Sequence, residues 1–461
     1  MVLQPTIMKF GGTSVEDTCA FQRVVQIVSA HKDMRPVIVV SAMSRFTDAL
    51  LQSVQMAADG NASAASSWLE DHYERHEDVA SSLLGAVEAS LFEAALNKAR
   101  SEIRELCVSI AAHSMPHAAL QDSVVSYGEQ LSSTLLAAVL RENNLPAHYL
   151  DARRLIVTDD EHGRAAPLFA ETMRRTRAEL EPLIEAGEMP VLGGFIAASR
   201  SGATTTLGRG GSDYSAALTG AVLQAREIQI WTDVTGVLTA DPRLVESART
   251  IPQLSYREAA ELAYFGAKVL HPKTMQPAVE GRIPVRVSNT RQPSEAGTVI
   301  LTETAVSPST VKAIAHKTGI TIVQITSARM LGAYGFLRAI FEIFDRHRTV
   351  VDIVTTSEVS VSLSLDEASA LPAIIEELRQ LGTVEIEPRR AIICVVGEGL
   401  RSTPGIAAHV FSTIRDINVS LISLGASSVN LTFVLDEEQV REAVMRLHAA
   451  FFERAADVYV S

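Results

Sequence analysis

The sequence has few of the features that mark secreted, membrane or zinc-binding proteins. Its three cysteines, Cys19, Cys107 and Cys394, lie far apart and form no CxxC pair, which excludes a disulfide framework. Its histidines form no HExxH motif and no Cys/His cluster, so no metal site built by the protein is expected. No apolar run approaches the roughly 18 to 20 residues of a membrane span, and the N-terminus lacks the regions of a signal peptide. The sequence therefore predicts a cytoplasmic protein with reduced thiols.

Long blocks of one charge are absent as well. The formal net charge is −13, and neither sign is gathered into a run, so neither nucleic acid nor an anionic membrane is expected as a partner. Small solutes are the expected partners. A length of 461 residues with 47% hydrophobic residues is enough for two to four domains with buried cores.

The first 300 or so residues alternate short β-rich segments with longer helical ones. The strand-like segments are 6–10, 36–42, 190–196, 228–233 and 283–289. One helical pattern begins near Val15, further helices extend from the second strand through Asn144, and two more begin at Ser212 and near Ser255. This alternation predicts an α/β sandwich with a largely parallel sheet. Segment 129–142 carries leucines and valines at helical spacing, which places Glu129 at the N-terminal end of a helix.

An internal repeat follows beyond about Glu303. Residues 335–366 align without a gap on residues 405–436, and each copy has the pattern of strand, glycine turn, helix, strand, turn and strand. Two copies are too few for a solenoid, so we expect them to pack side by side or across a dimer axis.

Two motifs in the first half combine glycine with charge. In "KFGGTSV", Lys9 precedes Gly11 and Gly12 between a strand and a helix, where backbone N–H groups can approach a phosphate. A plain strand-to-helix turn is an equal alternative, since the order is neither that of the P-loop nor GxGxxG.

The segment "LGRGGSD" is more specific. Ser212 and Asp213 can cap the following helix, and the glycines keep Arg209 near its N–H groups. We favour an anion site over a capped helix with a surface pair between Arg209 and Asp213, because three glycines exceed what capping needs.

Two later segments add candidates. In "WTDVTGVLTADPR" a strand ends at Thr232 and Asp233, with a hairpin as the alternative, and "YFGAKVLHP" places Lys268 among small residues, with a solvated lysine as the alternative. Lys9, Arg209 and Lys268 all stand at glycine-rich ends of predicted elements, where an open α/β sheet gathers its ligands.

These motifs resemble those of a known family. "KFGGTSV", "SYGEQLS", "TLGRGGSDYSAAL", "WTDVTGVLTADPR" and "FGAKVLHP", in this order and followed by "VDIVTTSEVSVSL", are similar to the aspartate kinases, of the monofunctional, lysine-sensitive type. The resemblance covers nearly the whole chain. It implies an amino-acid-kinase (carbamate-kinase-like) αβα sandwich over residues 1–302. Two ferredoxin-like α+β ACT regulatory domains would follow, at 303–386 and 387–461, the second of which can include strand 308–318.

The resemblance also implies a reaction. An aspartate kinase transfers the γ-phosphoryl group of ATP, with Mg²⁺ held mainly by the nucleotide phosphates, to the side-chain carboxylate of L-aspartate, giving 4-phospho-L-aspartate and ADP. This is the first step of lysine, threonine and methionine biosynthesis. The implied catalytic residues are Lys9, Arg209 and Asp213, and the implied substrate-binding residues are Ser41, Thr47, Glu129, Arg209, Ser212 and Asp213. Arg209 would pair with a substrate carboxylate and Glu129 with the ammonium group.

The nucleotide is implied to contact Lys9, Gly11, Gly12, Thr232, Asp233, Leu238, Arg243 and Lys268. Members of the family usually carry tyrosine at the position of Leu238, so the aromatic contact made there is not expected in this chain.

The two copies of the repeat differ in their acidic residues. The first has Asp352 and Glu358 where the second has Ile422 and Ser428, which suits an effector with two cationic groups, lysine rather than threonine; two solvated acids are the alternative. The resemblance adds Met330 and Ser357 to the effector site, and implies a homodimer or a dimer of dimers through the ACT domains.

Two other functions are compatible with the sequence. One is a sibling amino-acid kinase acting on acetylglutamate, glutamate or a nucleoside monophosphate. The other is a catalytically silent amino-acid sensor, although such a protein has no need to combine Lys9, Arg209, Asp213 and Lys268.

Overall fold

The computed structural model describes residues 4–112, 118–266, 270, 272–302, 310–332, 334–366 and 369–453. The chain divides into two compact units. Unit 1 comprises residues 1–237, 252–256 and 269–303, and unit 2 comprises 238–251, 257–268 and 304–461.

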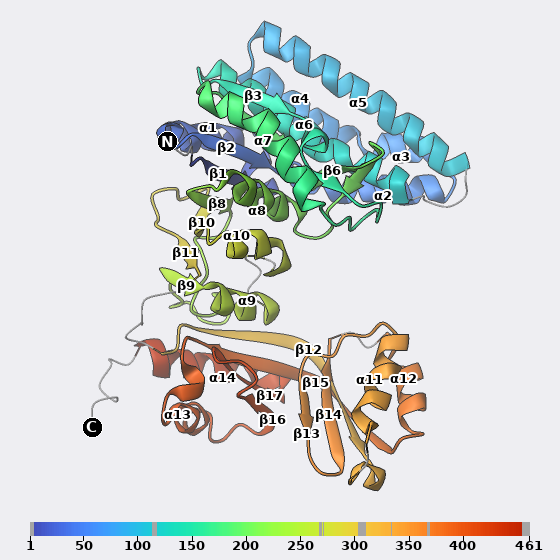
Figure 1. The fold of residues 1–461 in the computed structure, drawn as a ribbon, viewed down its shortest axis with the longest axis vertical. Helices are drawn as coiled ribbons and strands as arrows, with labels where there is room; N and C mark the ends of the chain where they lie inside the picture. The colour runs from blue at the N-terminus through green and yellow to red at the C-terminus, as the bar shows by residue number, and fades with distance from the viewer. Residues whose placement is uncertain are drawn as a thin grey trace. The chain divides into compact units, whose positions relative to one another are not determined.

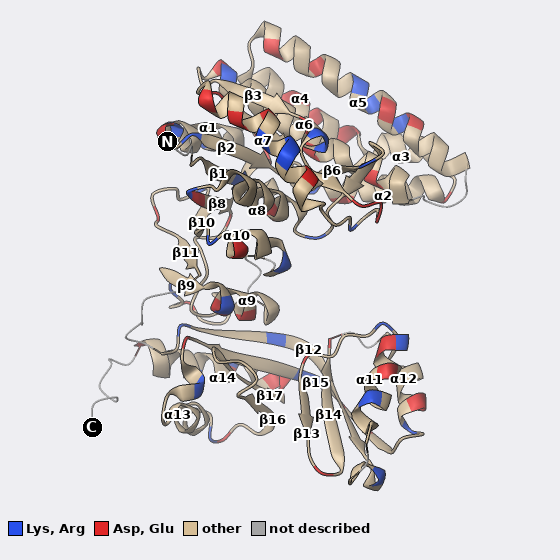
Figure 2. Cartoon of the chain, in the orientation of Figure 1, with Lys and Arg blue, Asp and Glu red and all other residues tan. Residues whose placement is uncertain are grey.

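Figure 2 shows acidic and basic residues interspersed along helices such as α5 (Ala86–Ala112). In the described residues, no helix is both long and apolar enough to span a membrane.

In the part of the chain that the structure describes, unit 1 is built on a largely parallel sheet of eight strands in the order β3-β5-β2-β1-β8-β10-β11-β9, in which only β10 and β11 pair in antiparallel fashion. These strands are β1 (Thr6–Phe10), β2 (Pro36–Val40), β3 (Ala147–Leu150), β5 (Met189–Gly193), β8 (Glu227–Thr232), β9 (Gln253–Ser255), β10 (Val285–Asn289) and β11 (Thr298–Leu301). A small sheet adds β4 (Val157–Thr158), β6 (Ile196–Ser199) and β7 (Thr204–Thr206). The five predicted strands of this half are thereby confirmed.

Helices cover both faces of the large sheet, since every residue of β1, β2 and β5 is buried. The helix α6 (Ala118–Glu142) packs against β2, β3 and β5 and beside α1 (Thr18–Ala30), whereas α8 (Gly211–Leu223) packs against β1, β2 and β8 and beside α7 (Phe169–Glu185). Further helices are α2 (Phe46–Ala58), α3 (Ala62–Trp68), α4 (Glu70–Leu83) and α10 (Gln276–Glu280). The long α5 lies on the outer side of α4 and α6 (Figure 1).

Unit 2 contains an antiparallel sheet that both copies of the repeat share, in the order β13-β14-β12-β15-β17-β16. Its strands are β12 (Ala313–Thr326), β13 (Val354–Thr356), β14 (Ser360–Leu365), β15 (Thr383–Val396), β16 (Val419–Leu424) and β17 (Asn430–Asp436). Its helices are α9 (Tyr256–Tyr264), α11 (Phe336–Arg346), α12 (Leu371–Leu378), α13 (Ile406–Thr413) and α14 (Val440–His448). The first residue of α9 belongs to unit 1. The two copies lie side by side in one sheet, because β12 and β15 pair along almost their whole lengths (Figure 1).

The repeat is visible in local geometry as well as in topology. Gly335 and Gly405 each precede the helix of their copy with a positive φ, of 80° and 77°, which an L side chain rarely adopts. Each copy also has its own apolar core, one beneath α11 and α12 and the other beneath α13 and α14.

Candidate functional site

The carboxyl ends of four parallel strands gather most of the predicted site residues of unit 1. Strands β1, β2, β5 and β8 are neighbours with parallel register, so the loops that follow them open at the same edge of the sheet. Ligands of open α/β sheets bind at this edge. Lys9, Ser41 and Thr232 stand at or just before the ends of these strands.

Lys9 forms an ion pair inside the unit. Its Nζ lies 2.8 Å from Oδ1 of Asp213, and the two side chains are only 11% and 15% exposed. Asp213 belongs to the first turn of α8, where an acidic residue also interacts favourably with the helix dipole. Since Asp213 pairs with Lys9, the alternative of a surface pair between Arg209 and Asp213 is wrong.

The glycines after β1 are held by hydrogen bonds to strand β8 and to the loop after β2. The N–H of Gly11 donates to the carbonyl of Trp231 at 3.0 Å, and the carbonyl of Gly12 accepts from the N–H of Ser44 at 3.2 Å. Gly12 also begins a short 3₁₀ helix, and the first N–H groups of a helix have no partner within it. The Gly12 N–H is therefore the better placed of the two to meet an anion.

Glu129 lies within α6, about three turns from its start, so its predicted position at a helix N-terminus is wrong. The helix begins earlier because the residues before Glu129 continue its buried face. Oε1 of Glu129 accepts from the N–H of Ala42 at 3.1 Å, and Oε2 is buried and has no hydrogen-bond partner among the described residues. Burial raises the pKa of this carboxyl to about 8, against the smaller lowering by the Ala42 N–H and by Lys9. A buried oxygen left without a partner suits a ligand that brings a donor.

Glycines allow these elements to approach so closely. A Cβ on Gly128 would lie 2.8 Å from the Cβ of Ala42, and one on Gly193 would lie 2.9 Å from the Cβ of Glu129. At Gly194 it would lie 2.6 Å from the Cβ of Ser212. Gly193 and Gly194 are not among the residues that the sequence predicts for the site. A glycine pair at a strand end, as after β1, was the available signal.

The loop that carries Arg209 is shaped by two left-handed glycines. Gly208 and Gly210 have φ values of 74° and 73°, and Gly210 is the N-cap of α8 without a side-chain hydrogen bond. The prediction that Ser212 caps this helix is therefore wrong, because the left-handed turn brings Ser212 into the first turn. The Arg209 side chain is exposed at the start of α8.

The remaining predicted residues of unit 1 lie close to these loops in the chain. Ser41 follows β2, and its backbone N–H donates to the Phe10 carbonyl at 3.0 Å. Its backbone carbonyl accepts from the Ser132 hydroxyl of α6 at 2.8 Å. Thr47 lies in the first turn of α2. Thr232 ends β8, and its hydroxyl donates to Asp233 at 3.1 Å.

Three predicted nucleotide residues lie elsewhere in the chain. Leu238 and Arg243 belong to unit 2, where Leu238 forms an isolated bridge with Thr250 and Arg243 pairs with Asp241 at 2.6 Å. Lys268 lies outside the described residues, as does His271.

Three of the predicted effector residues lie in the first copy of the repeat, and Met330 lies just before it. Met330 belongs to a short 3₁₀ helix, and Ser357 and Glu358 lie in the turn between β13 and β14. Asp352 precedes β13, and its side chain is only 3% exposed, with Lys317 Nζ at 3.4 Å. The Tyr264 hydroxyl also donates to Asp352. Burial raises the pKa of this carboxyl above its ordinary value.

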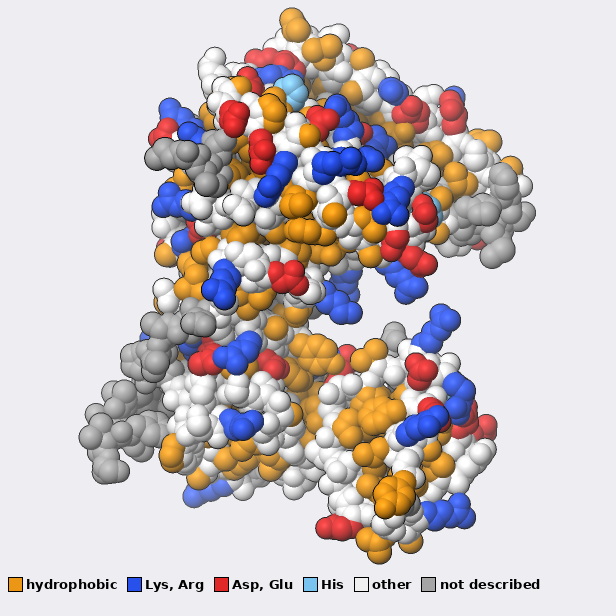
Figure 3. All heavy atoms as spheres, viewed as in Figure 1, with side chains coloured by type: hydrophobic (Ala, Val, Ile, Leu, Met, Phe, Trp, Pro, Cys, Tyr) orange, Lys and Arg blue, Asp and Glu red, His pale blue; other side chains and the backbone are white. Residues whose placement is uncertain are grey.

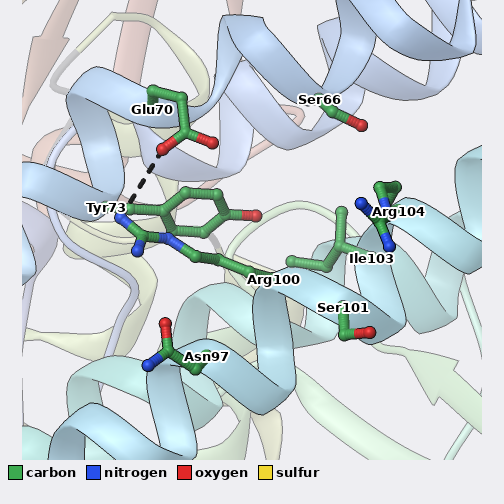
Figure 4. A pocket seen from close by; sticks show the side chains of 8 residues that line it. All are labelled: Ser66, Glu70, Tyr73, Asn97, Arg100, Ser101, Ile103 and Arg104. Carbon is green, nitrogen blue, oxygen red and sulfur yellow. Dashed lines mark ion pairs between the residues drawn. The ribbon is translucent and has the colours of Figure 1, made fainter.

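One cavity lies apart from all of these residues. It has a volume of about 320 Å³ and is lined by Ser66, Glu70, Tyr73, Asn97, Arg100, Ser101, Ile103 and Arg104 (Figure 4). Arg100 lies over the Tyr73 ring, 4.9 Å from its centroid, and pairs with Glu70 at 3.5 Å and Glu77 at 3.0 Å. Its charge is thus already balanced, and no predicted site residue faces this cavity.

Comparisons with known proteins show which family the chain resembles. The profile of the amino acid kinase family matches residues 4–289, and an ACT domain profile matches residues 393–451. Lysine-sensitive aspartokinase 3 of Escherichia coli is 36% identical over 97% of this chain and 99% of its own length. Chloroplastic aspartokinase 2 of Arabidopsis thaliana is 38% identical over 97% of this chain and 84% of its own length. The fold also resembles a crystal structure of E. coli aspartokinase III in complex with aspartate and ADP in the R-state, with a TM-score of 0.83 and 35% sequence identity. The match covers 97% of this chain and 100% of the crystallised chain.

Proposed function

Since the chain belongs to the amino acid kinase family, and within it to the aspartokinases, we propose the following reaction for it. The γ-phosphoryl group of ATP moves to the side-chain carboxylate of L-aspartate and gives 4-phospho-L-aspartate and ADP. The observation that carries this proposal is the convergence of Lys9, Asp213 and Glu129 at one edge of the parallel sheet. The related E. coli enzyme has been crystallised with aspartate and ADP.

The chemistry needs positive charge more than it needs a base. The aspartate side chain, with a pKa of about 3.9, is already ionised at neutral pH, so no proton has to be removed before it attacks. The obstacle is the approach of one anion to another, and catalysis rests on alignment and on fixed positive charge. We assign this charge to Lys9, together with the Gly12 N–H, and assign to Asp213 the task of orienting Lys9.

The aspartate pocket is proposed to hold both ends of the amino acid. Arg209 pairs with a carboxylate through its planar guanidinium, a geometry that lysine cannot reproduce. Glu129 receives the ammonium group on its unpartnered Oε2. Ser41, Thr47 and Ser212 supply the polar wall.

The nucleotide is proposed to lie near Thr232 and Asp233, with Gly11 as a further contact that the family resemblance suggests. Mg²⁺ accompanies ATP, with its oxygen ligands supplied mainly by the phosphates, as is usual for this ion. The described residues contain no group of three or more His, Cys, Asp or Glu side chains able to hold a metal.

An ADP-release assay tests the proposal against its alternatives. We expect ADP formation with L-aspartate, and none above background with glutamate or acetylglutamate. Turnover with acetylglutamate instead would favour a sibling kinase, and no turnover with any acceptor would favour a silent sensor.

The pH dependence of substrate binding tests the role of Glu129. Only the ionised carboxylate attracts the ammonium group, and its pKa in the free protein is about 8. The KM for aspartate should therefore fall about fivefold from pH 7 to pH 8, as more of the carboxyl ionises. Steady-state kinetics over this range would show it, and Glu129→Gln should remove the pH dependence and raise KM. A wild-type KM that does not change with pH would contradict the assignment.

Regulation is proposed to act through the first copy of the repeat. L-Lysine is the proposed effector; a relative has been crystallised with lysine and aspartate in the T-state. Glu358, which is exposed in the turn after β13, is proposed to receive one cationic group of lysine. Asp352, which is buried and pairs with Lys317, would have to exchange that partner for the other cationic group. Effector binding would then shift the kinase toward a less active state.

Neutralising Glu358 tests this placement without disturbing the core, because this side chain is exposed. Glu358→Gln should raise the lysine concentration for half-inhibition by about tenfold, as expected when an ion pair to the effector is lost, and leave the uninhibited rate unchanged. Glu438→Gln, an exposed residue of the second copy, is the matched control. Unchanged inhibition in Glu358→Gln and in Asp352→Asn would show that lysine binds elsewhere.

Self-association is proposed to involve unit 2. Apolar side chains are exposed on and around α11, among them Leu331, Tyr334, Leu337 and Phe341, and Figure 3 shows hydrophobic side chains gathered on unit 2. Such patches commonly mark protein interfaces, which supports a homodimer or a dimer of dimers through the ACT domains. We also propose that the chain has three domains, at residues 1–302, 303–386 and 387–461. A cytoplasmic location is proposed as well, and three free cysteines support it.

A further inference from the structure

We infer that Asp122 is a positioning residue that fixes the Arg209 loop relative to Glu129; this inference rests on the proposed function of these two residues. Asp122 lies on α6, about two turns before Glu129. Its side chain is 1% exposed, and it occupies no place in the reaction proposed above.

Four groups donate hydrogen bonds to this buried carboxylate. The Thr206 hydroxyl donates at 2.6 Å and the Thr206 N–H at 3.2 Å, the Gly163 N–H at 3.0 Å, and Nδ1 of His162 lies 2.9 Å away. Among the described residues, no lysine or arginine forms an ion pair with it. Hydrogen bonds to an ionised carboxylate are stronger than those between neutral groups, so these donors stabilise the carboxylate where it is buried.

All four donors belong to the two segments that support Arg209. Thr206 ends β7, three residues before Arg209. The turn at Gly163 packs against the same loop, since a Cβ on Gly208 would lie 3.2 Å from the Gly163 carbonyl oxygen. The Ala165 N–H also donates to the Thr206 carbonyl at 2.9 Å. Asp122 thereby ties the base of the Arg209 loop to α6.

This tie has a consequence for aspartate binding. The carboxylate and ammonium groups of one aspartate molecule are a fixed distance apart, so the residues that receive them must be held at a matching separation. Glu129 and Asp122 share one helix, and a helix is rigid over two turns. Loosening the Asp122 contacts should therefore weaken aspartate binding and leave ATP binding unchanged.

Substitutions at Thr206 test the inference with little change in shape. Thr206→Val removes the hydroxyl donor and should raise the KM for aspartate about tenfold, with the KM for ATP within twofold of wild type. Thr206→Ser keeps the donor and should restore the wild-type KM. Thr205→Val is the matched control, because the Thr205 hydroxyl bonds to Thr158 and not to Asp122. Asp122→Asn should show the same pattern as Thr206→Val, more strongly.

Hydrogen exchange provides a readout that needs no activity. Backbone exchange over residues 207–211 should be faster in Thr206→Val than in wild type or Thr205→Val. The inference is overturned if Thr206→Val and Thr205→Val have equal KM values for aspartate and equal exchange. A wild-type protein without aspartate-dependent ADP release would overturn the proposed function instead, while the exchange comparison would still decide whether Asp122 holds the loop.

Discussion

Replacing Lys9 by methionine should lower kcat by about a thousandfold, which is the largest single effect that the site predicts. Methionine keeps the packing of the stem but removes the ammonium group that offsets charge on the transferring phosphoryl group. In this structure that ammonium lies 2.8 Å from Asp213. Steady-state kinetics with saturating ATP and aspartate would measure the loss.

Two further variants separate catalysis from folding. Lys9→Met leaves Asp213 without its partner, which destabilises a protein when the remaining charge is buried. The double variant Lys9→Met/Asp213→Asn removes both charges and should regain thermal stability without regaining activity. Lys98→Met, at a side chain 74% exposed on α5, should behave as wild type. A kcat within tenfold of wild type in Lys9→Met would contradict the role of Lys9.

Replacing Arg209 by lysine should lower kcat/KM for aspartate about a hundredfold, mainly through KM. The charge is kept, but the paired hydrogen bonds of the guanidinium to a carboxylate are lost. Because Arg209 is exposed, the fold should be unaffected. The KM for ATP should stay within twofold of wild type.

An arginine on a neighbouring loop provides the control for Arg209. Arg164 is 84% exposed and pairs weakly with Glu161 at 3.8 Å, so Arg164→Lys should leave both KM values unchanged. If Arg209→Lys changed the KM for ATP as much as that for aspartate, Arg209 would belong to the nucleotide site.

The strands of unit 1 could be predicted because their residues are buried on both faces. Strand β2 is a run of β-branched residues after a proline, and β1 is largely apolar apart from Thr6 and Lys9, so composition indicates both strands. The long pairing of β12 with β15 could not be predicted from composition in the same way. It depends on how two copies of the repeat align, and the sequence predicted the copies but left side-by-side packing and a dimer axis open.

The site was predicted in its residues but not in its geometry. Glu129 was expected at a helix end, and it lies inside α6, where Gly128 permits close contact with Ala42. Ser212 was expected as the cap of α8, and Gly210 takes that place. The start of α6 was predicted too late in the chain, although its buried face continues before Glu129. At α8 a left-handed turn overrode the capping preference of serine, which capping rules cannot anticipate.

The identity of the product tests the account most directly. Acyl phosphates react with hydroxylamine, so the phosphorylated carboxylate can be trapped as a hydroxamate and located by mass spectrometry. With ATP, Mg²⁺ and L-aspartate, we expect the 4-hydroxamate of aspartate, and we expect the Lys9→Met variant to form at most about a thousandth as much. Hydroxamate at the α-carboxylate, or from glutamate or acetylglutamate but not from aspartate, would contradict the proposed reaction.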